Sequence, residues 1–150
     1  YLAGEAFTRP ITESGRLIND HPDIRLRAVR LLSVLGTVRT SRILASQLRH
    51  EWAPEVITAI FETLGILSYD TEGKIMDMVS SRFSKLEEQR LADSRTADAA
   101  LGAVLGLASW SGGINDAGFD LLRSIYSGPY SRSSRTAALQ SLARYKSDPR

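Results

Sequence analysis

One pattern of ten residues occurs four times along the chain, in segments 24–33, 56–65, 93–102 and 134–143. In every segment the ninth residue is Leu, the fifth is Ala or Ile, and the tenth is small. Successive segments begin 32, 37 and 41 residues apart, which is room for two helices and two turns each time. A unit of this size buries its apolar face only against its neighbours. The pattern therefore predicts a stack of similar helix pairs.

Apolar residues recur at steps of three and four throughout the chain, which is the period of an amphipathic helix. Pro22 and Pro54 suit first helical turns, where a missing N–H costs nothing. Breaks are expected at Gly36, at 112–113 and at 128–129, where glycine or a Gly-Pro pair interrupts the helical period. We find no run in which apolar and polar residues alternate as in a strand. The predicted fold class is all-α.

Three glycines lie inside predicted helices, at Gly65, Gly102 and Gly106. A glycine within a helix costs about 1 kcal/mol relative to alanine. We interpret these three positions as places where two helix backbones approach closely.

The first repeated segment resembles the second helix of a HEAT repeat of the short bacterial type. The matching residues are Pro22-Asp23-Ile24-Arg25, Ala28, Leu31-Leu32 and Leu35-Gly36. The second segment keeps Pro54-Glu55-Val56 and Leu64-Gly65 but has Ile57 in place of the arginine; the third keeps Ala97 and Ala100-Leu101-Gly102 without an opening proline; the fourth keeps Arg135, Ala138 and Leu142. The resemblance runs from about residue 10 to residue 146, and armadillo or related helical repeats share much of the pattern.

The resemblance implies a right-handed α-solenoid, or α-α superhelix, of about four HEAT-like helix pairs. The whole of 1–150 would be one repeat domain and part of a longer protein. The expected repeats span about 10–36, 40–68, 71–110 and 113–146, and a helix over 10–19 would open the first of them.

Composition excludes several classes of protein. The hydrophobic content of 43% and the net charge of +2 do not fit intrinsic disorder. The absence of cysteine excludes disulfides, zinc-thiolate sites and iron–sulfur clusters, and two histidines alone do not suggest a metal site. The longest nearly apolar run, 99–110, is about half the ~20 residues of a membrane span. We expect a soluble chain without cofactor, metal or membrane insertion. Its compartment does not follow from the sequence, which favours the cytoplasm only slightly.

No catalytic motif stands out. His50 precedes Glu51, but no second histidine follows at the spacing of a zinc helix. The chain has no Gly-x-Ser-x-Gly elbow, and the glycine pair at 112–113 lacks the preceding strand of a phosphate loop. Asp116 and Asp120 lie near a predicted helix start, where acidic residues interact well with the helix dipole. We expect that the chain is not an enzyme.

The resemblance implies that the second helices line a concave face that holds other macromolecules. The fourth, seventh and eleventh positions of the repeated pattern lie away from the apolar stripe and should be exposed. Besides the candidate binding residues, these positions include Val34, Ala59, Ile66, Thr96, Ala99, Ala103 and Ala137. The candidate binding residues are Arg27, Arg30, Glu62, Gln140 and Arg144. We expect a protein or peptide partner and a function as an interaction scaffold.

Charge is uneven along the chain and leaves two alternatives. Residues 1–50 carry a net charge of +4, residues 51–100 carry −5, and residues 101–150 carry +3. The arginine-rich ends of the concave face could bind nucleic acid, although the acidic middle would repel phosphate. A HEAT-like enzyme, such as a lyase, is the other alternative. The oligomeric state does not follow from the sequence.

Overall fold

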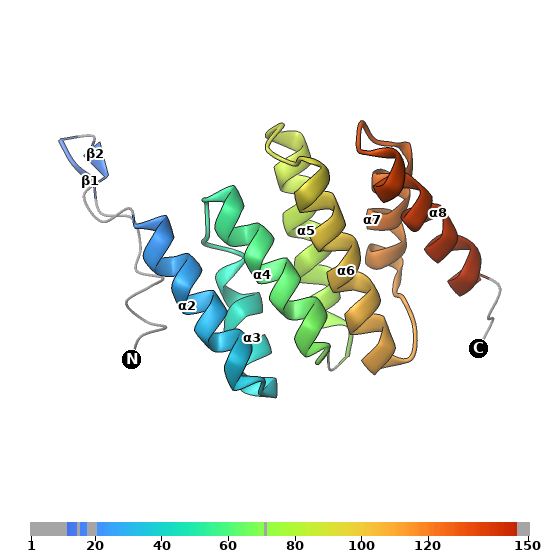
Figure 1. Ribbon diagram of the computed structural model, residues 1–150, viewed down its shortest axis with the longest axis horizontal. Coiled ribbons are helices and arrows are strands. Elements are labelled where there is room, and N and C mark those ends of the chain that lie inside the picture. Colours follow the sequence, from blue (N-terminus) through green and yellow to red (C-terminus); the bar gives the residue numbers. More distant parts are fainter. Residues whose placement is uncertain (1–11, 15, 18–20, 71, 147–150) are drawn as a thin grey trace.

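The computed structural model describes residues 12–14, 16–17, 21–70 and 72–146. These residues form seven helices, preceded by one short hairpin (Figure 1). The all-α prediction is confirmed for the described residues from Pro22 to Lys146. The helices are α2 (Pro22–Leu35), α3 (Val38–Gln47), α4 (Pro54–Leu67), α5 (Lys74–Glu88), α6 (Ser94–Ser111), α7 (Asp116–Ser127) and α8 (Arg132–Lys146).

The hairpin corrects the helix predicted over 10–19. Strand β1 (Thr12–Glu13) pairs antiparallel with β2 (Arg16–Leu17), so that Thr12 lies opposite Leu17. Ser14, between them, has a left-handed backbone with φ of 51°. Serine favours turns because its hydroxyl competes for backbone hydrogen bonds, and this turn interrupts the expected helix. The other residues of that predicted helix lie outside the described residues.

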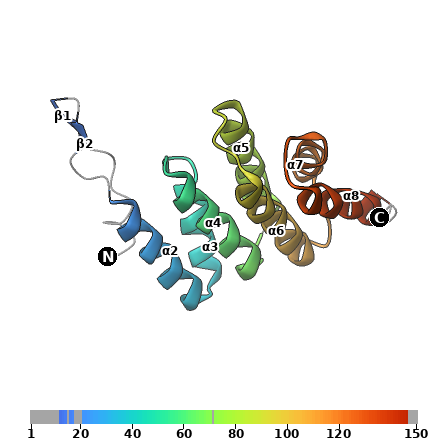
Figure 2. The ribbon, with the colours of Figure 1, turned by 45° about the horizontal axis from the view of Figure 1, so that its top comes forward.

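The helices form two layers (Figures 1 and 2). Helices α2, α4, α6 and α8 contact one another in that order, and α3, α5 and α7 do the same in the second layer. All four repeated segments lie in the first layer. The core between the layers contains fully buried side chains from both, including Leu44, Ile60, Phe61, Phe83, Val104, Leu107 and Leu122.

The two central helices of the first layer touch backbone to backbone. A Cβ atom at Gly106 would lie 2.1 Å from the carbonyl oxygen of Gly65, and one at Gly65 would lie 2.8 Å from the carbonyl oxygen of Gly102. Close packing is therefore confirmed at Gly65 and Gly106. Gly102 differs, because a Cβ atom there would meet nothing within 4 Å. Its backbone is contacted, but its lack of a side chain is not required.

Short side chains fix where helices begin. Asp93 accepts a hydrogen bond of 2.7 Å from the Thr96 amide and thereby caps α6. Buried Asp70 accepts bonds of 3.0 Å from the amides of Ile75 and Met76, at the start of α5. Such carboxylates satisfy amides that have no partner within the helix. The loops between the layers are therefore held by the ends of the helices they join.

The contact between α4 and α6 predicts opposite effects of two similar substitutions. Gly106→Ala should lower the free energy of unfolding by about 1–3 kcal/mol, because the new methyl group overlaps backbone that cannot move aside. Gly102→Ala should leave the free energy of unfolding unchanged or raise it by up to about 1 kcal/mol, because alanine favours a helix. Urea unfolding followed by circular dichroism measures both. Equal destabilisation by the two substitutions would contradict the close contact.

The cap of α6 predicts a dependence of stability on pH. Hydrogen bonds from Thr96, chiefly from its backbone amide, lower the pKa of the Asp93 carboxyl below its ordinary range. The charged cap therefore stabilises the fold above roughly pH 4, and this contribution is lost as the pH falls through the lowered pKa. Asp93→Ala should cost about 1 kcal/mol at pH 7. Asp93→Asn keeps the cap but does not titrate, so its stability difference from the unaltered protein should shrink on acidification. Denaturant unfolding at several pH values tests this. If the stability difference between Asp93→Asn and the unaltered protein stayed constant with pH, the proposed role of the charged cap would be contradicted.

Candidate binding surfaces

The five candidate binding residues are all exposed on the first layer. Arg30 and Glu62 line a cleft of about 300 Å³ between α2 and α4. Gln140 and Arg144 lie on α8, at the other end of the first layer. Arg27 is not among the residues that line the cleft. The structure therefore brings two of the five together. The other lining residues are Leu26, Ser33, Glu55, Ala59, Thr63, Ile66 and Arg95.

Four other positions that we expected to be exposed are buried: Ala59, Thr96, Ala99 and Ala103. The Thr96 hydroxyl lies 3.1 Å from that of Thr58 on α4, and the Ala103 Cα borders Gly65. These residues of α6 therefore face α4. For these three residues the cause is a register error, because the pattern of burial in α6 matches that of α2 and α4 when the third segment begins one residue earlier, at position 92. Ala59 lies on α4, in the second segment, so this shift does not account for its burial.

In the corrected register, the fourth, seventh and eleventh positions of α6 are Arg95, Asp98 and Gly102, which are all exposed. Arg95 joins the cleft and its guanidinium lies 3.5 Å from the Glu62 carboxylate. Arg95 was not among the predicted residues, although Asp93 followed by Thr96 is a recognisable capping sequence that sets the start of this helix. With Glu62 and Asp98 on the same face, the arginines do not form a continuous positive stripe.

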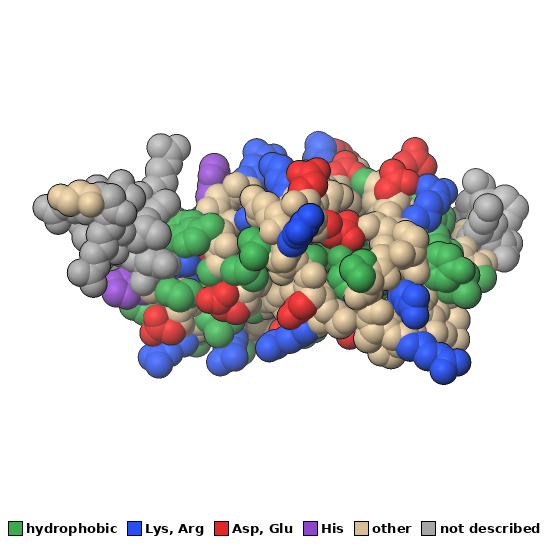
Figure 3. Space-filling view, turned by 90° about the horizontal axis from the view of Figure 1, so that it is seen from above, with side chains coloured by type: hydrophobic (Ala, Val, Ile, Leu, Met, Phe, Trp, Pro, Cys, Tyr) green, Lys and Arg blue, Asp and Glu red, His purple; other side chains and the backbone are tan. Residues whose placement is uncertain are grey.

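The outer side of α2 carries an exposed apolar row. Ile24, Leu31 and Leu35 are spaced seven and four residues apart, which places them on one side of the helix. Their exposed fractions are 50%, 58% and 66%. At the same positions of α4, Val56 and Thr63 are buried. Figure 3 shows hydrophobic side chains gathered at the α2 end of the molecule, next to the residues drawn in grey.

A buried ion pair fixes α2 on the rest of the molecule. The Arg25 guanidinium donates to both carboxylate oxygens of Glu51, at 2.9 and 3.2 Å, and both side chains are almost fully buried. The same guanidinium lies 4.3 Å from the centre of the Trp52 ring. Glu51 also accepts from the amides of Trp52 and Ala53, each at 2.9 Å, just before α4. Arg25 therefore ties α2 to the loop between α3 and α4.

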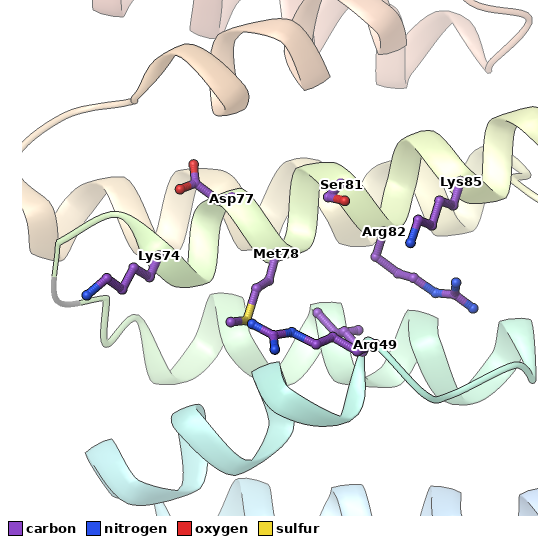
Figure 4. A pocket seen from close by; sticks show the side chains of 8 residues that line it. Arg49, Lys74, Asp77, Met78, Ser81, Arg82 and Lys85 are labelled. Atoms are coloured by element: carbon purple, nitrogen blue, oxygen red, sulfur yellow. The ribbon is translucent and has the colours of Figure 1, made fainter.

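A groove of about 490 Å³ lies on the second layer, between the end of α3 and α5 (Figure 4). Its lining residues are Leu48, Arg49, Lys74, Asp77, Met78, Ser81, Arg82 and Lys85. This region does not stand out in the sequence, because Lys74, Arg82 and Lys85 lie in the acidic stretch 51–100, whereas Arg49 belongs to the basic stretch before it. The Arg82 guanidinium donates to the Glu51 carbonyl, and burial lowers the pKa of this guanidinium while the Glu51 carboxylate opposes the shift.

Glu87 has a structural role, although its neighbour Glu88 is exposed. The Glu87 carboxylate accepts hydrogen bonds from the Ser124 hydroxyl, at 2.6 and 2.7 Å, and from the Tyr130 hydroxyl at 2.7 Å. Burial and the bond to Glu87 raise the pKa of the Tyr130 hydroxyl, which stays protonated as a donor. These bonds join α5 to α7 and to the loop that precedes α8.

Among the described residues there is no group of three or more His, Asp or Glu side chains that could hold a metal ion. None of the described helices combines the length and apolar character needed to cross a membrane. Comparisons with protein-family models, curated proteins and solved structures returned no match.

The buried and exposed ion pairs predict contrasting effects. Glu51→Ala should lower the free energy of unfolding by about 3–5 kcal/mol, because it leaves Arg25 charged and buried without this carboxylate. Glu51→Gln keeps one acceptor oxygen and should cost less. Glu62→Ala removes the exposed pair with Arg95 and should change stability by less than about 1 kcal/mol. Thermal and urea unfolding compare the three variants. If Glu62→Ala lowered the free energy of unfolding as much as Glu51→Ala, the assigned role of the buried pair would be refuted.

Proposed function

We propose that this chain is a HEAT-like, right-handed α-solenoid that acts as a non-catalytic protein-interaction scaffold. The fold proposal is supported by the order of contacts, because equivalent helices follow one another in each layer. In it, α3 with α4, α5 with α6, and α7 with α8 form successive helix pairs. Helix α2 corresponds to the second helix of such a pair.

The apolar row on α2 carries the functional proposal. In a stack of similar helices, each helix covers one side of the next. Thr58 and Gly65 of α4 contact α6, and Val56 and Thr63 lie on the opposite side of α4, toward α2. The equivalent side of α2 holds Ile24, Leu31 and Leu35, which no described helix covers. Contiguous exposed apolar surface of this kind marks interaction sites.

The partner that fits this surface is a helix of another protein with its own apolar stripe. Such a helix would pack on α2 as α2 packs on α4. Arg27 and Arg30 lie beside the row on the exposed face of α2 and would face acidic residues of the partner. Arg30 also lines the cleft with Glu62, so the partner's side chains would extend over α4.

The arrangement of polar groups supports a function without catalysis or a cofactor. The buried carboxylates that could serve as an acid or base are used in structural bonds: Glu51 with Arg25, and Asp70 with the start of α5. Catalysis requires a group within reach of a substrate proton. Both of these groups are instead closed off by the helices they join.

The proposal predicts that partner binding depends on the α2 row. Leu31→Glu with Leu35→Glu should reduce retention of specific proteins from a lysate of the source organism at least roughly tenfold, because charge on an apolar contact prevents its burial. The matched control is Leu91→Glu with Leu139→Glu, which makes the same chemical change at two exposed leucines elsewhere. Quantitative mass spectrometry of the retained proteins measures the difference, with circular dichroism as the check on folding.

If both double variants lost the same amount of retained protein, the proposed role of the α2 row in binding would be contradicted. Retention that disappears after nuclease treatment would favour the nucleic-acid alternative. Reconstitution with one purified retained protein, whose affinity falls only in the α2 variant, would complete the test.

A further inference from the structure

The groove between the end of α3 and α5 carries an excess of positive charge. Its lining includes Arg49, Lys74, Arg82 and Lys85, and one acidic side chain, Asp77. Lys74 forms an ion pair with Glu72. In the part of the chain that the structure describes, Arg49, Arg82 and Lys85 form no ion pair.

The one carboxylate in the lining does not neutralise these cations. Asp77 accepts a hydrogen bond of 2.8 Å from the Asn115 side chain, at the start of α7. Figure 4 shows Asp77 pointing away from Arg49, whereas Arg82 and Lys85 point toward the side of α5 on which α3 lies. The groove therefore presents cations to whatever enters it.

Arg82 has an unused donor at the edge of this groove. Its terminal nitrogen donates to the Glu51 carbonyl, but its Nε is buried and has no acceptor among the described residues. Nε itself is closed to a bound ligand, but Arg82 as a whole is partly exposed and lines the groove. Its positive charge is therefore available to a carboxylate bound there.

The floor and length of the groove favour a peptide as the occupant. Met78 provides an apolar surface between the cations, above the buried side chain of Leu48, and methionine adapts to different apolar side chains. No lining residue is aromatic, so the groove lacks a platform on which nucleic-acid bases stack. Lys74 and Lys85 are eleven residues apart on α5, which is about 16 Å along the helix. About five residues of extended peptide have this length.

We propose that this groove binds a short, extended acidic peptide segment of a partner protein. Its carboxylates face Arg49, Arg82 and Lys85, and an apolar side chain between them contacts Met78. This surface lies on the second layer, whereas the α2 row belongs to the first. The inference deepens the proposed scaffold function by naming a second partner chemistry, and it does not depend on the α2 row.

The test uses the full chain and the peptide acetyl-Glu-Asp-Leu-Asp-Glu-amide, followed by backbone amide shifts in NMR titrations. Shifts should concentrate at Leu48, Met78 and Ser81. The affinity should fall at least roughly tenfold in the double variant Arg49→Gln with Lys85→Gln. The matched control, Arg132→Gln with Arg135→Gln, removes the same charge from exposed positions on α8 and should change the affinity less than about twofold.

Two further probes identify what the groove recognises. The amide peptide acetyl-Gln-Asn-Leu-Asn-Gln-amide should bind at least roughly tenfold more weakly, because it lacks the carboxylates. A five-residue oligothymidylate should bind more weakly than the acidic peptide, because the lining has no aromatic side chain. Tighter binding of the oligonucleotide at the same residues would overturn the proposal in favour of nucleic acid.

Three other outcomes would also overturn it. These are equal weakening by both double variants, shifts that map outside the groove, and no shifts at millimolar peptide. None of them bears on the α2 row, whose own test uses Leu31 and Leu35. Failure of the groove proposal is therefore distinguishable from failure of the scaffold proposal.

Discussion

The contact between the backbones of α4 and α6 sets the geometry of the first layer. Gly65 and Gly106 allow the two helices to meet without side chains between them, and the Thr58 and Thr96 hydroxyls join the same helices nearer their N-terminal ends. Because α2 packs on α4 and α8 packs on α6, the positions of both outer helices depend on this central pair. A close-packed contact of this kind transmits any change in spacing to its neighbours.

An ion pair and hydrogen bonds at the loops also fix the positions of the helices. Arg25 and Glu51 hold α2 against the loop before α4, and Glu87 holds α5 to the loop before α8. The bonds lie between elements that are distant in the sequence. Removing one partner of such a buried pair strongly lowers the free energy of unfolding. These bonds therefore favour one arrangement of the helices over others. The proposed binding surface on α2 therefore lies on a helix that a buried ion pair ties to its neighbours.

Helices were predictable from the sequence because their signals are local. Proline at positions 22 and 54 and the apolar period of three and four mark α2 and α4 without reference to the rest of the molecule. The exposed side of α6 was not predictable from the shared leucine alone, because rotating a helix by one residue turns each position by about 100° and exchanges buried for exposed sides. Thr96, Ala99 and Ala103 are small enough to suit either side, so only their contact with α4 decides.

The sequence by itself determined that the described residues between Pro22 and Lys146 are mostly helical, that repeated segments recur, and that glycines mark a close contact. The tertiary structure decided which side of each helix is buried, that residues 12–17 contain a hairpin, and that Glu51 is the partner of Arg25. It also brought Arg49 and α5 together in one cationic groove. The physical reason is that helical period and capping depend on neighbours within a few residues. Burial, ion pairing and surface charge depend on which distant segments come into contact.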